Sequence, residues 1–232
     1  MGVELNDDLV STWVTGWART HNYEVTHEGR VHTAQPTTDP EALEHVLYAP
    51  DEVELRRIAS AVGRSPKRLL TVIAEPNDEV MDLRTIDGLE LISDEEVIMI
   101  ADMEHQDVED PITPEEFTTS RDDFDEWTLF TVKHGDATAA RGRLAVVNGF
   151  SILDRIYTSP DYRRQGLGTF VTRALLAIAH EQEVEHGLLV ATHDGRELYE
   201  YLGWERVGDV HVFGAPGATD RRRPSHSQHD NI

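Results

Sequence analysis

Residues 163–168, with the sequence R-R-Q-G-L-G, carry the pattern best suited to chemistry in this 232-residue chain. Gly166 and Gly168 allow the main chain to turn tightly and to approach a ligand with no Cβ in the way. The apolar stretch that follows predicts a helix from Leu167, whose first N–H groups and positive dipole end point into the turn. Because Arg163 and Arg164 lie beside that point, the segment predicts an anion site, and a pyrophosphate suits it best.

The sequence excludes two common phosphate-binding loops. It contains no G-x-x-x-x-G-K-[ST], which excludes an ATP or GTP P-loop, and no G-x-G-x-x-G, which excludes the dinucleotide loop. What remains is R-x-x-G-x-G, a pattern that fits an ordinary helix start as well as a ligand loop. The segments on either side of the loop are therefore needed to distinguish a ligand loop from an ordinary helix start.

Hydrophobic periodicity predicts the elements that must position this loop. Residues 127–158 alternate as three strands joined by tight turns. The helix that follows the loop has apolar residues at helical spacing, and residues 188–192 predict a short buried strand. A second helix over 196–202 ends at Gly203, where a C-cap glycine belongs, and a last strand follows over 204–213.

Two motifs in this order resemble the Gcn5-related N-acetyltransferase family. The first is R-x-x-G-x-G at 163–168, after R-I-Y-T-S-P-D-Y. The second is L-Y-E-Y-L-G-W at 198–204, which is similar to the family's L-Y-x-x-x-G-F with Trp204 in place of Phe. The resemblance implies an α/β (α+β) fold, with a mixed, mostly antiparallel sheet and flanking helices. It also implies acetyl-CoA as the cosubstrate, with its pyrophosphate in the loop.

The resemblance also implies which residues bind the cofactor. The strand at 153–158 would pair through its main chain with the pantetheine arm, as an added strand would. In the family this strand splays from the next one, which leaves main-chain groups free, and the loop contacts are mostly backbone N–H groups. The cofactor positions carried over are Ile156, Tyr157, Thr158, Arg163, Arg164, Gln165, Gly166, Leu167, Gly168 and Thr169.

For catalysis, Tyr199 matches the family's tyrosine that protonates the departing thiolate, and a phenol with a pKa of about 10 suits that step. The alternative is that Tyr199 only packs under the cofactor. The position aligned with the family's glutamate base is Ile152, which cannot serve. Asp154, two residues on and on the same strand face, is the best carboxylate there, and its alternative role is an ion pair with a neighbour such as Arg155.

Other candidates for the proton acceptor are His193 and Asp194, which follow the next strand. Tyr201 points to a different helix face from Tyr199 and is a poorer candidate for the acid. The chain contains twelve histidines, but none form a pair at metal-ligand spacing with carboxylate support, so no metal is predicted.

The chain is longer than the catalytic domain that the resemblance implies, and we divide it into three parts. Residues 1–77 form a small accessory N-terminal α/β unit, residues 78–215 form the acetyltransferase domain, and residues 216–232 form a disordered tail. The accessory unit begins with an amphipathic helix over 5–20 that Asn6 can cap. It contains no catalytic motif, and we expect it to cover one face of the sheet or to serve in a homodimer.

Composition limits the partners and the location. The formal net charge of −23 argues against nucleic acid, whose phosphates need a basic face. Acidic runs at 104–110 and 122–126 could face a cationic substrate, or they could be solvated surface. No stretch is long and apolar enough to span a membrane, the N-terminus lacks a signal-peptide pattern, and cysteine is absent. Together these features predict a cytoplasmic protein.

These expectations describe an acetyl-CoA-dependent N-acetyltransferase that moves an acetyl group to a primary amine, with a small molecule as the acceptor. The amine would attack directly, without a covalent enzyme intermediate, once a base, a water chain or desolvation exposes its lone pair. Two alternatives stay open: the acceptor is a peptide or protein, or the chain is a non-catalytic CoA-binding sensor module. The absence of the family's glutamate keeps the last alternative open.

Overall fold

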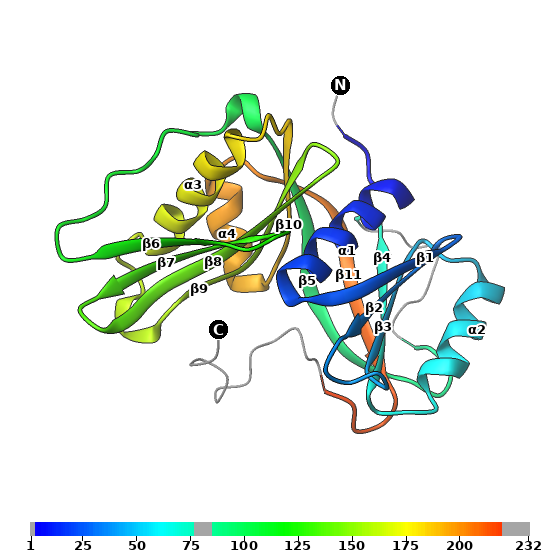
Figure 1. The fold of residues 1–232 in the computed structure, drawn as a ribbon. Coiled ribbons are helices and arrows are strands. Elements are labelled where there is room, and N and C mark those ends of the chain that lie inside the picture. The colour runs from blue at the N-terminus through cyan, green and yellow to red at the C-terminus, as the bar shows by residue number, and fades with distance from the viewer. Residues whose placement is uncertain (1–2, 77–84, 220–232) are drawn as a thin grey trace.

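The computed structural model describes residues 3–76 and 85–219, which form one eleven-stranded sheet with four α-helices packed on it (Figure 1). The helices are α1 Asp7–His21, α2 Glu52–Val62, α3 Leu167–His180 and α4 His193–Tyr201, and two short 3-10 helices lie at Met103–His105 and Pro160–Tyr162. The strands are β1 Tyr23–Glu28, β2 Val31–Pro36, β3 Leu43–Tyr48, β4 Arg68–Ala74, β5 Glu90–Asp102, β6 Thr118–Asp123, β7 Thr128–His134, β8 Ala137–Val147, β9 Phe150–Thr158, β10 His186–Ala191 and β11 Glu205–Gly214.

The sheet has the order β1-β2-β3-β4-β11-β5-β10-β9-β8-β7-β6. Its neighbours are antiparallel except for β3 with β4 and β9 with β10, which are parallel. The predicted mixed, mostly antiparallel sheet with flanking helices is therefore confirmed. None of the helices in the described part of the chain has both the length and the apolar character that a membrane crossing requires.

The same arrangement of strands occurs twice along the chain. In the N-terminal half, β1, β2 and β3 pair antiparallel, and α2 connects β3 to its parallel neighbour β4. In the C-terminal half, β7, β8 and β9 pair antiparallel, and α3 connects β9 to its parallel neighbour β10. The strand that follows each half pairs with the other half: β5 pairs with β10, and β11 pairs with β4. Since β5 and β11 also pair with each other, the two halves share one continuous sheet.

The predicted division of the chain stays a proposal. The boundary placed after residue 77 lies outside the described residues, as does the predicted tail from residue 220 onward. On the two sides of the gap at 77–84, β4 and β5 belong to the same sheet and only β11 lies between them. A division at this point would therefore cut through a shared sheet.

Helix α1 lies across the central strands of the sheet (Figure 1). Its N-terminus forms as predicted, because the Asn6 side chain accepts a backbone N–H of the first turn at 2.9 Å. Its apolar face includes Trp13 and Trp17, each only 3% exposed, and packs against β8 and β9. The contact with β9 is close enough that a Cβ on Gly16 would lie 2.3 Å from a side-chain carbon of Ile152. The N-terminal segment thus covers one face of the sheet, which is the first of its two expected roles.

Candidate active site

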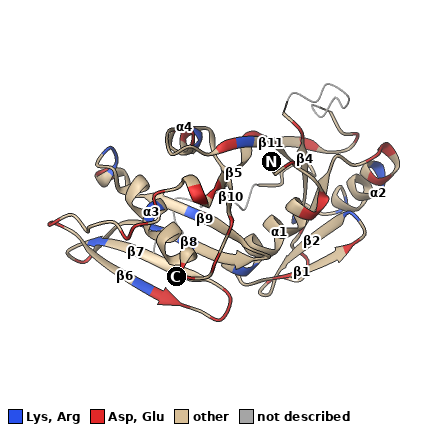
Figure 2. Cartoon of the chain, turned by 90° about the horizontal axis from the view of Figure 1, so that it is seen from above, with Lys and Arg blue, Asp and Glu red and all other residues tan. Residues whose placement is uncertain are grey.

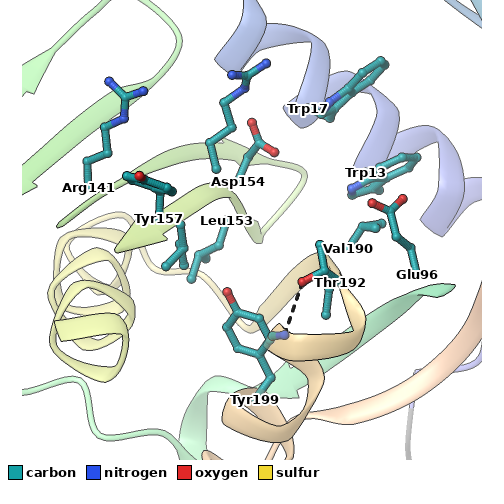
Figure 3. A pocket seen from close by; sticks show the side chains of 14 residues that line it. Trp13, Trp17, Glu96, Arg141, Leu153, Asp154, Tyr157, Val190, Thr192 and Tyr199 are labelled. Atoms are coloured by element: carbon teal, nitrogen blue, oxygen red, sulfur yellow. Dashed lines mark hydrogen bonds between the residues drawn. The ribbon is translucent and has the colours of Figure 1, made fainter. Parts of the chain in front are cut away.

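The two parallel strands of the C-terminal half separate along their length. β9 and β10 pair only through residues 150–152 and 186–188, whereas β3 and β4 pair over six residues each. A cavity of about 280 Å³ lies in this opening, lined by residues 153–157 of β9 and by residues 190–192 at the end of β10 (Figure 3). The geometry agrees with the splay that the family resemblance implies, and it occurs in only one half of the repeated arrangement.

A bulge in β9 shapes the same opening. Asp154 pairs with Arg143 and Tyr157 pairs with Arg141, so two residues of β9 lie opposite the single residue Gly142 of β8. Arg155, inside the bulge, has a φ of +48°, a left-handed conformation that is uncommon outside glycine. The other side of the bulge is tightly packed, since a Cβ on Gly142 would lie 2.8 Å from side-chain atoms of both Val171 and Leu175 in α3.

The loop after β9 forms the turn that the glycine spacing predicts. Arg164 has a φ of +61° and Gly166 a φ of +79°, and Gly166 is the N-cap of α3. No side chain caps this helix, and the first backbone hydrogen bond into it runs from the Phe170 N–H to the Gly166 carbonyl at 3.0 Å. The N–H groups of the preceding residues 167–169 therefore lie ahead of the helical hydrogen-bond ladder, where they can bind an anion.

The structure places the expected cofactor residues in three positions. Ile156 and Tyr157 line the cavity, and Thr158 ends β9. The exposed turn contains Arg163, Arg164, Gln165 and Gly166. The first helical turn contains Leu167, Gly168 and Thr169, and only the main chain of Leu167 can reach a ligand, because its side chain is 2% exposed and packs in the core. A Cβ on Gly168 would lie 3.1 Å from Leu198 of α4, so this glycine permits the close approach of the two helices.

Tyr199 lies in α4, and its hydroxyl points into the cavity (Figure 3). Burial raises the pKa of the phenol, and the charge of Asp154 raises it further, so the group is protonated at neutral pH. Tyr201 is 83% exposed on the opposite side of the helix, as expected. The ring of Tyr199 packs 5.7 Å from that of Trp204. Gly187 accommodates this large ring, because a Cβ there would lie 2.6 Å from Trp204.

Asp154 lines the cavity, but side chains of α1 bind its carboxylate. Thr20 Oγ1 donates a hydrogen bond to Asp154 Oδ2 at 2.8 Å, and His21 Nε2 lies 2.8 Å from the same oxygen. Burial alone would raise the pKa of Asp154, but His21, Arg155 and Thr20 together lower it. The Asp154 carboxylate is therefore bound by neighbouring side chains, and its direct partners are Thr20 and His21 rather than the expected Arg155.

The structure does not bring the other candidate groups into the cavity. His193 and Asp194 are exposed in the first turn of α4, and neither lines the opening. The acidic residues within 104–110 and 122–126 are exposed as well, and Figure 2 shows acidic residues, in red, at the end of the outer strand β6. The solvated-surface interpretation of these two runs therefore agrees with the structure.

Among the cavity residues outside both sequence motifs are four from α1, β5 and β8. Trp13 and Trp17 come from α1, Glu96 comes from β5, and Arg141 comes from β8. The two tryptophans are visible in the sequence only as part of an apolar helix face, which predicts burial and nothing more. Glu96 lies in an acidic stretch with no readable pattern, and yet it is only 5% exposed.

Residues 97–204 match the model of the Acetyltransferase (GNAT) family. An acetyltransferase of Stachybotrys chartarum is 33% identical over 66 residues, which is 28% of this chain and 28% of that relative. The chain therefore aligns with less than a third of the length of this curated relative.

Solved structures share the fold over most of the chain. A GCN5-related N-acetyltransferase from Kribbella flavida has a TM-score of 0.66 at 15% identity, covering 93% of this chain and 97% of that one. A putative GNAT acetyltransferase from Novosphingobium aromaticivorans has a TM-score of 0.59 at 13% identity, covering 89% and 96%. A tandem GNAT protein from the clavulanic acid biosynthesis pathway has a TM-score of 0.53 at 14% identity, covering 84% and 79%. Over residues 97–204, this chain is thus similar to the acetyltransferase (GNAT) family.

Proposed function

We propose that the chain is an acetyl-CoA-dependent N-acetyltransferase that transfers an acetyl group directly to the primary amine of a small molecule. The observation that carries this proposal is the continuous path from the uncapped start of α3, along the splayed strand β9, to the buried phenol of Tyr199. Each section of the path suits one part of acetyl-CoA. The coenzyme supplies an acetyl thioester, which an amine can attack without any protein nucleophile.

Three features of this chain support the binding of the coenzyme. The first N–H groups of α3 and the left-handed turn at Gly166 suit a diphosphate. The unpaired length of β9 beyond residue 152 suits an extended arm that pairs with the main chain. In the N-terminal half the matching strands β3 and β4 stay paired over their length, and Asp51 caps the following helix α2. These differences support a single coenzyme site, in the C-terminal half.

Tyr199 is the proposed general acid. In the transfer a C–N bond forms between the amine and the acetyl carbon, the C–S bond breaks, the sulfur takes the proton of the phenol, and the proton lost from the amine nitrogen restores the phenol. A phenol that burial holds in its protonated form can supply that proton in the cavity. Of the two proposed catalytic residues, Asp154 is less well supported than Tyr199, because a carboxylate with a lowered pKa accepts a proton poorly. Its contacts support a role in holding α1 against β9.

The wall formed by α1 supports a small acceptor. Trp13 and Trp17 close the cavity on the side of α1, and their rings stack with centroids 5.8 Å apart. A cavity of about 280 Å³ must hold both the acetyl end of the thioester and the reacting part of the acceptor. These dimensions suit a compact amine better than a folded protein surface.

Thiol release from acetyl-CoA in the presence of separate panels of small primary amines and of peptides tests the proposal. We expect the small amines to stimulate release, and the acetylated amine to appear in equal amount by mass spectrometry. Binding of CoA without turnover on either panel would favour a sensor module instead. Stimulation by peptides alone would replace the small-molecule acceptor with a peptide or protein.

A further inference from the structure

Glu96 faces the α1 side of the sheet. Side chains alternate along β5, and Val97 and Met99 belong to the cluster under α3, whereas Ile98 and Ile100 belong to the cluster under α1. Glu96 precedes this run and shares the face of Ile98. Its carboxylate therefore lies between the sheet and α1, on the opposite side of the sheet from the coenzyme loop and α3.

Glu96 also lies where the splay opens. Val97 of β5 pairs with Ala191, the last residue of the antiparallel strand β10. Glu96, which precedes Val97, therefore lies beside the end of β10, near Thr192. Glu96, Thr192 and Trp13 all line this cavity (Figure 3). Tyr199 enters the same cavity from α4, on the other side. An acceptor that reaches the thioester from the α1 side must therefore pass Glu96.

This carboxylate is placed to attract a cation. Glu96 is only 5% exposed. A carboxylate charge in such surroundings attracts a cation far more strongly than it would in water. The aromatic face of Trp13 adds attraction for an ammonium group. Because Glu96 lines the cavity from the α1 side of the sheet, an ammonium group that enters on that side would meet this carboxylate.

We propose that Glu96 and Trp13 form the subsite that binds the positively charged group of the acceptor, which is therefore a small organic ammonium compound. This inference rests on the proposed function, since it concerns the acceptor side of the same cavity. It assigns acceptor selection to α1 and β5, two elements outside both sequence motifs. Glu96 acts here as a specificity-determining residue.

Two thioethers of CoA test this inference without turnover. S-aminopropyl-CoA places an ammonium group in the cavity, and S-butyl-CoA places a methyl group at the same position. We expect the unmodified protein to bind the ammonium compound at least about tenfold more tightly by calorimetry, as for a charge-assisted hydrogen bond. Equal affinities for the two thioethers would overturn the inference, and this comparison needs no variant.

Variants then assign the preference to a residue. Glu96→Gln should remove the preference for the ammonium compound and leave the affinity for S-butyl-CoA unchanged. Glu95→Gln is the matched control, because it makes the same change at an adjacent exposed side chain, and it should keep the preference. A Glu96→Gln protein that keeps the preference would also overturn the inference. If CoA itself fails to bind, the proposed function fails and the subsite fails with it, whereas equal binding of the thioethers overturns the subsite alone.

Discussion

Replacing Gly166 with Asp separates coenzyme binding from folding. Gly166 has a φ of +79°, and no atom lies within 4 Å of the position its Cβ would occupy, so the new side chain meets no steric clash. The left-handed conformation costs a non-glycine residue about 1–2 kcal/mol, and Asp tolerates it better than most. A carboxylate at an N-cap returns about 1 kcal/mol by accepting N–H groups of the first turn. We expect the melting temperature to change by only a few degrees.

The same carboxylate should abolish coenzyme binding. It would occupy the N–H groups of the first turn of α3 and place a negative charge where the diphosphate is proposed to bind. Losing two charge-assisted hydrogen bonds, each worth about 1.5–3 kcal/mol, costs about 3 kcal/mol or more. The Kd for CoA should therefore rise by about 100-fold or more in a calorimetric titration.

Two controls make this result specific. Gly166→Ala introduces the backbone strain without the charge, and should weaken CoA binding much less than Gly166→Asp. Gly29→Asp adds the same charge to a turn with a φ of +61° and open space around its Cβ, between β1 and β2, and should leave the Kd unchanged. A Gly166→Asp protein that binds CoA as tightly as the unmodified chain would refute the assignment of the loop.

Three further changes test other parts of the account. Tyr199→Phe should lower kcat about 100-fold without changing the Kd for CoA; an unchanged kcat would remove the phenol from the acid role. Asp154→Asn should reduce stability to urea by about 1–3 kcal/mol at neutral pH. Because the folded pKa of Asp154 is lowered, this difference should persist above about pH 4 and shrink as the pH falls below it, and equal stability at neutral pH would argue against the anchoring role. Burial, with the charges of Arg68 and Arg57, lowers the pKa of His45 to about 4. The unfolded chain therefore binds an extra proton between about pH 6.5 and 4, and the free energy of unfolding should fall by up to about 3 kcal/mol across that window. In a His45→Gln protein the free energy of unfolding should fall less, and an identical fall in both proteins would contradict this.

The elements that the sequence predicts well are those whose signals are local. The apolar spacing after Gly166 predicts α3, and Asn6 with the acidic first turn predicts the start of α1. Helix α4, predicted to begin at residue 196, begins at His193, because Thr192 caps it and accepts the Gly195 N–H at 3.2 Å. The strand β6 gives no signal, since all its residues are exposed at the sheet edge and no alternation appears.

The parts that the sequence does not predict depend on contacts between distant segments. The exchange of β5 and β11 between the two halves is a matter of long-range pairing, which periodicity cannot indicate. The contact between Asp154 and His21 joins residues 133 positions apart, so the sequence alone does not reveal that the carboxylate is already bound. Glu96 is buried because α1 covers it, and an isolated glutamate in an acidic stretch gives no sign of that packing.

The structure of the complex with CoA tests the central claim most directly. We predict that the diphosphate lies within hydrogen-bond distance of the main-chain N–H groups of residues 166–169. We also predict that the pantetheine arm runs along β9 between the splayed strands, and that the sulfur lies beside the hydroxyl of Tyr199. A diphosphate bound elsewhere, or a sulfur outside the opening between β9 and β10, would contradict the account.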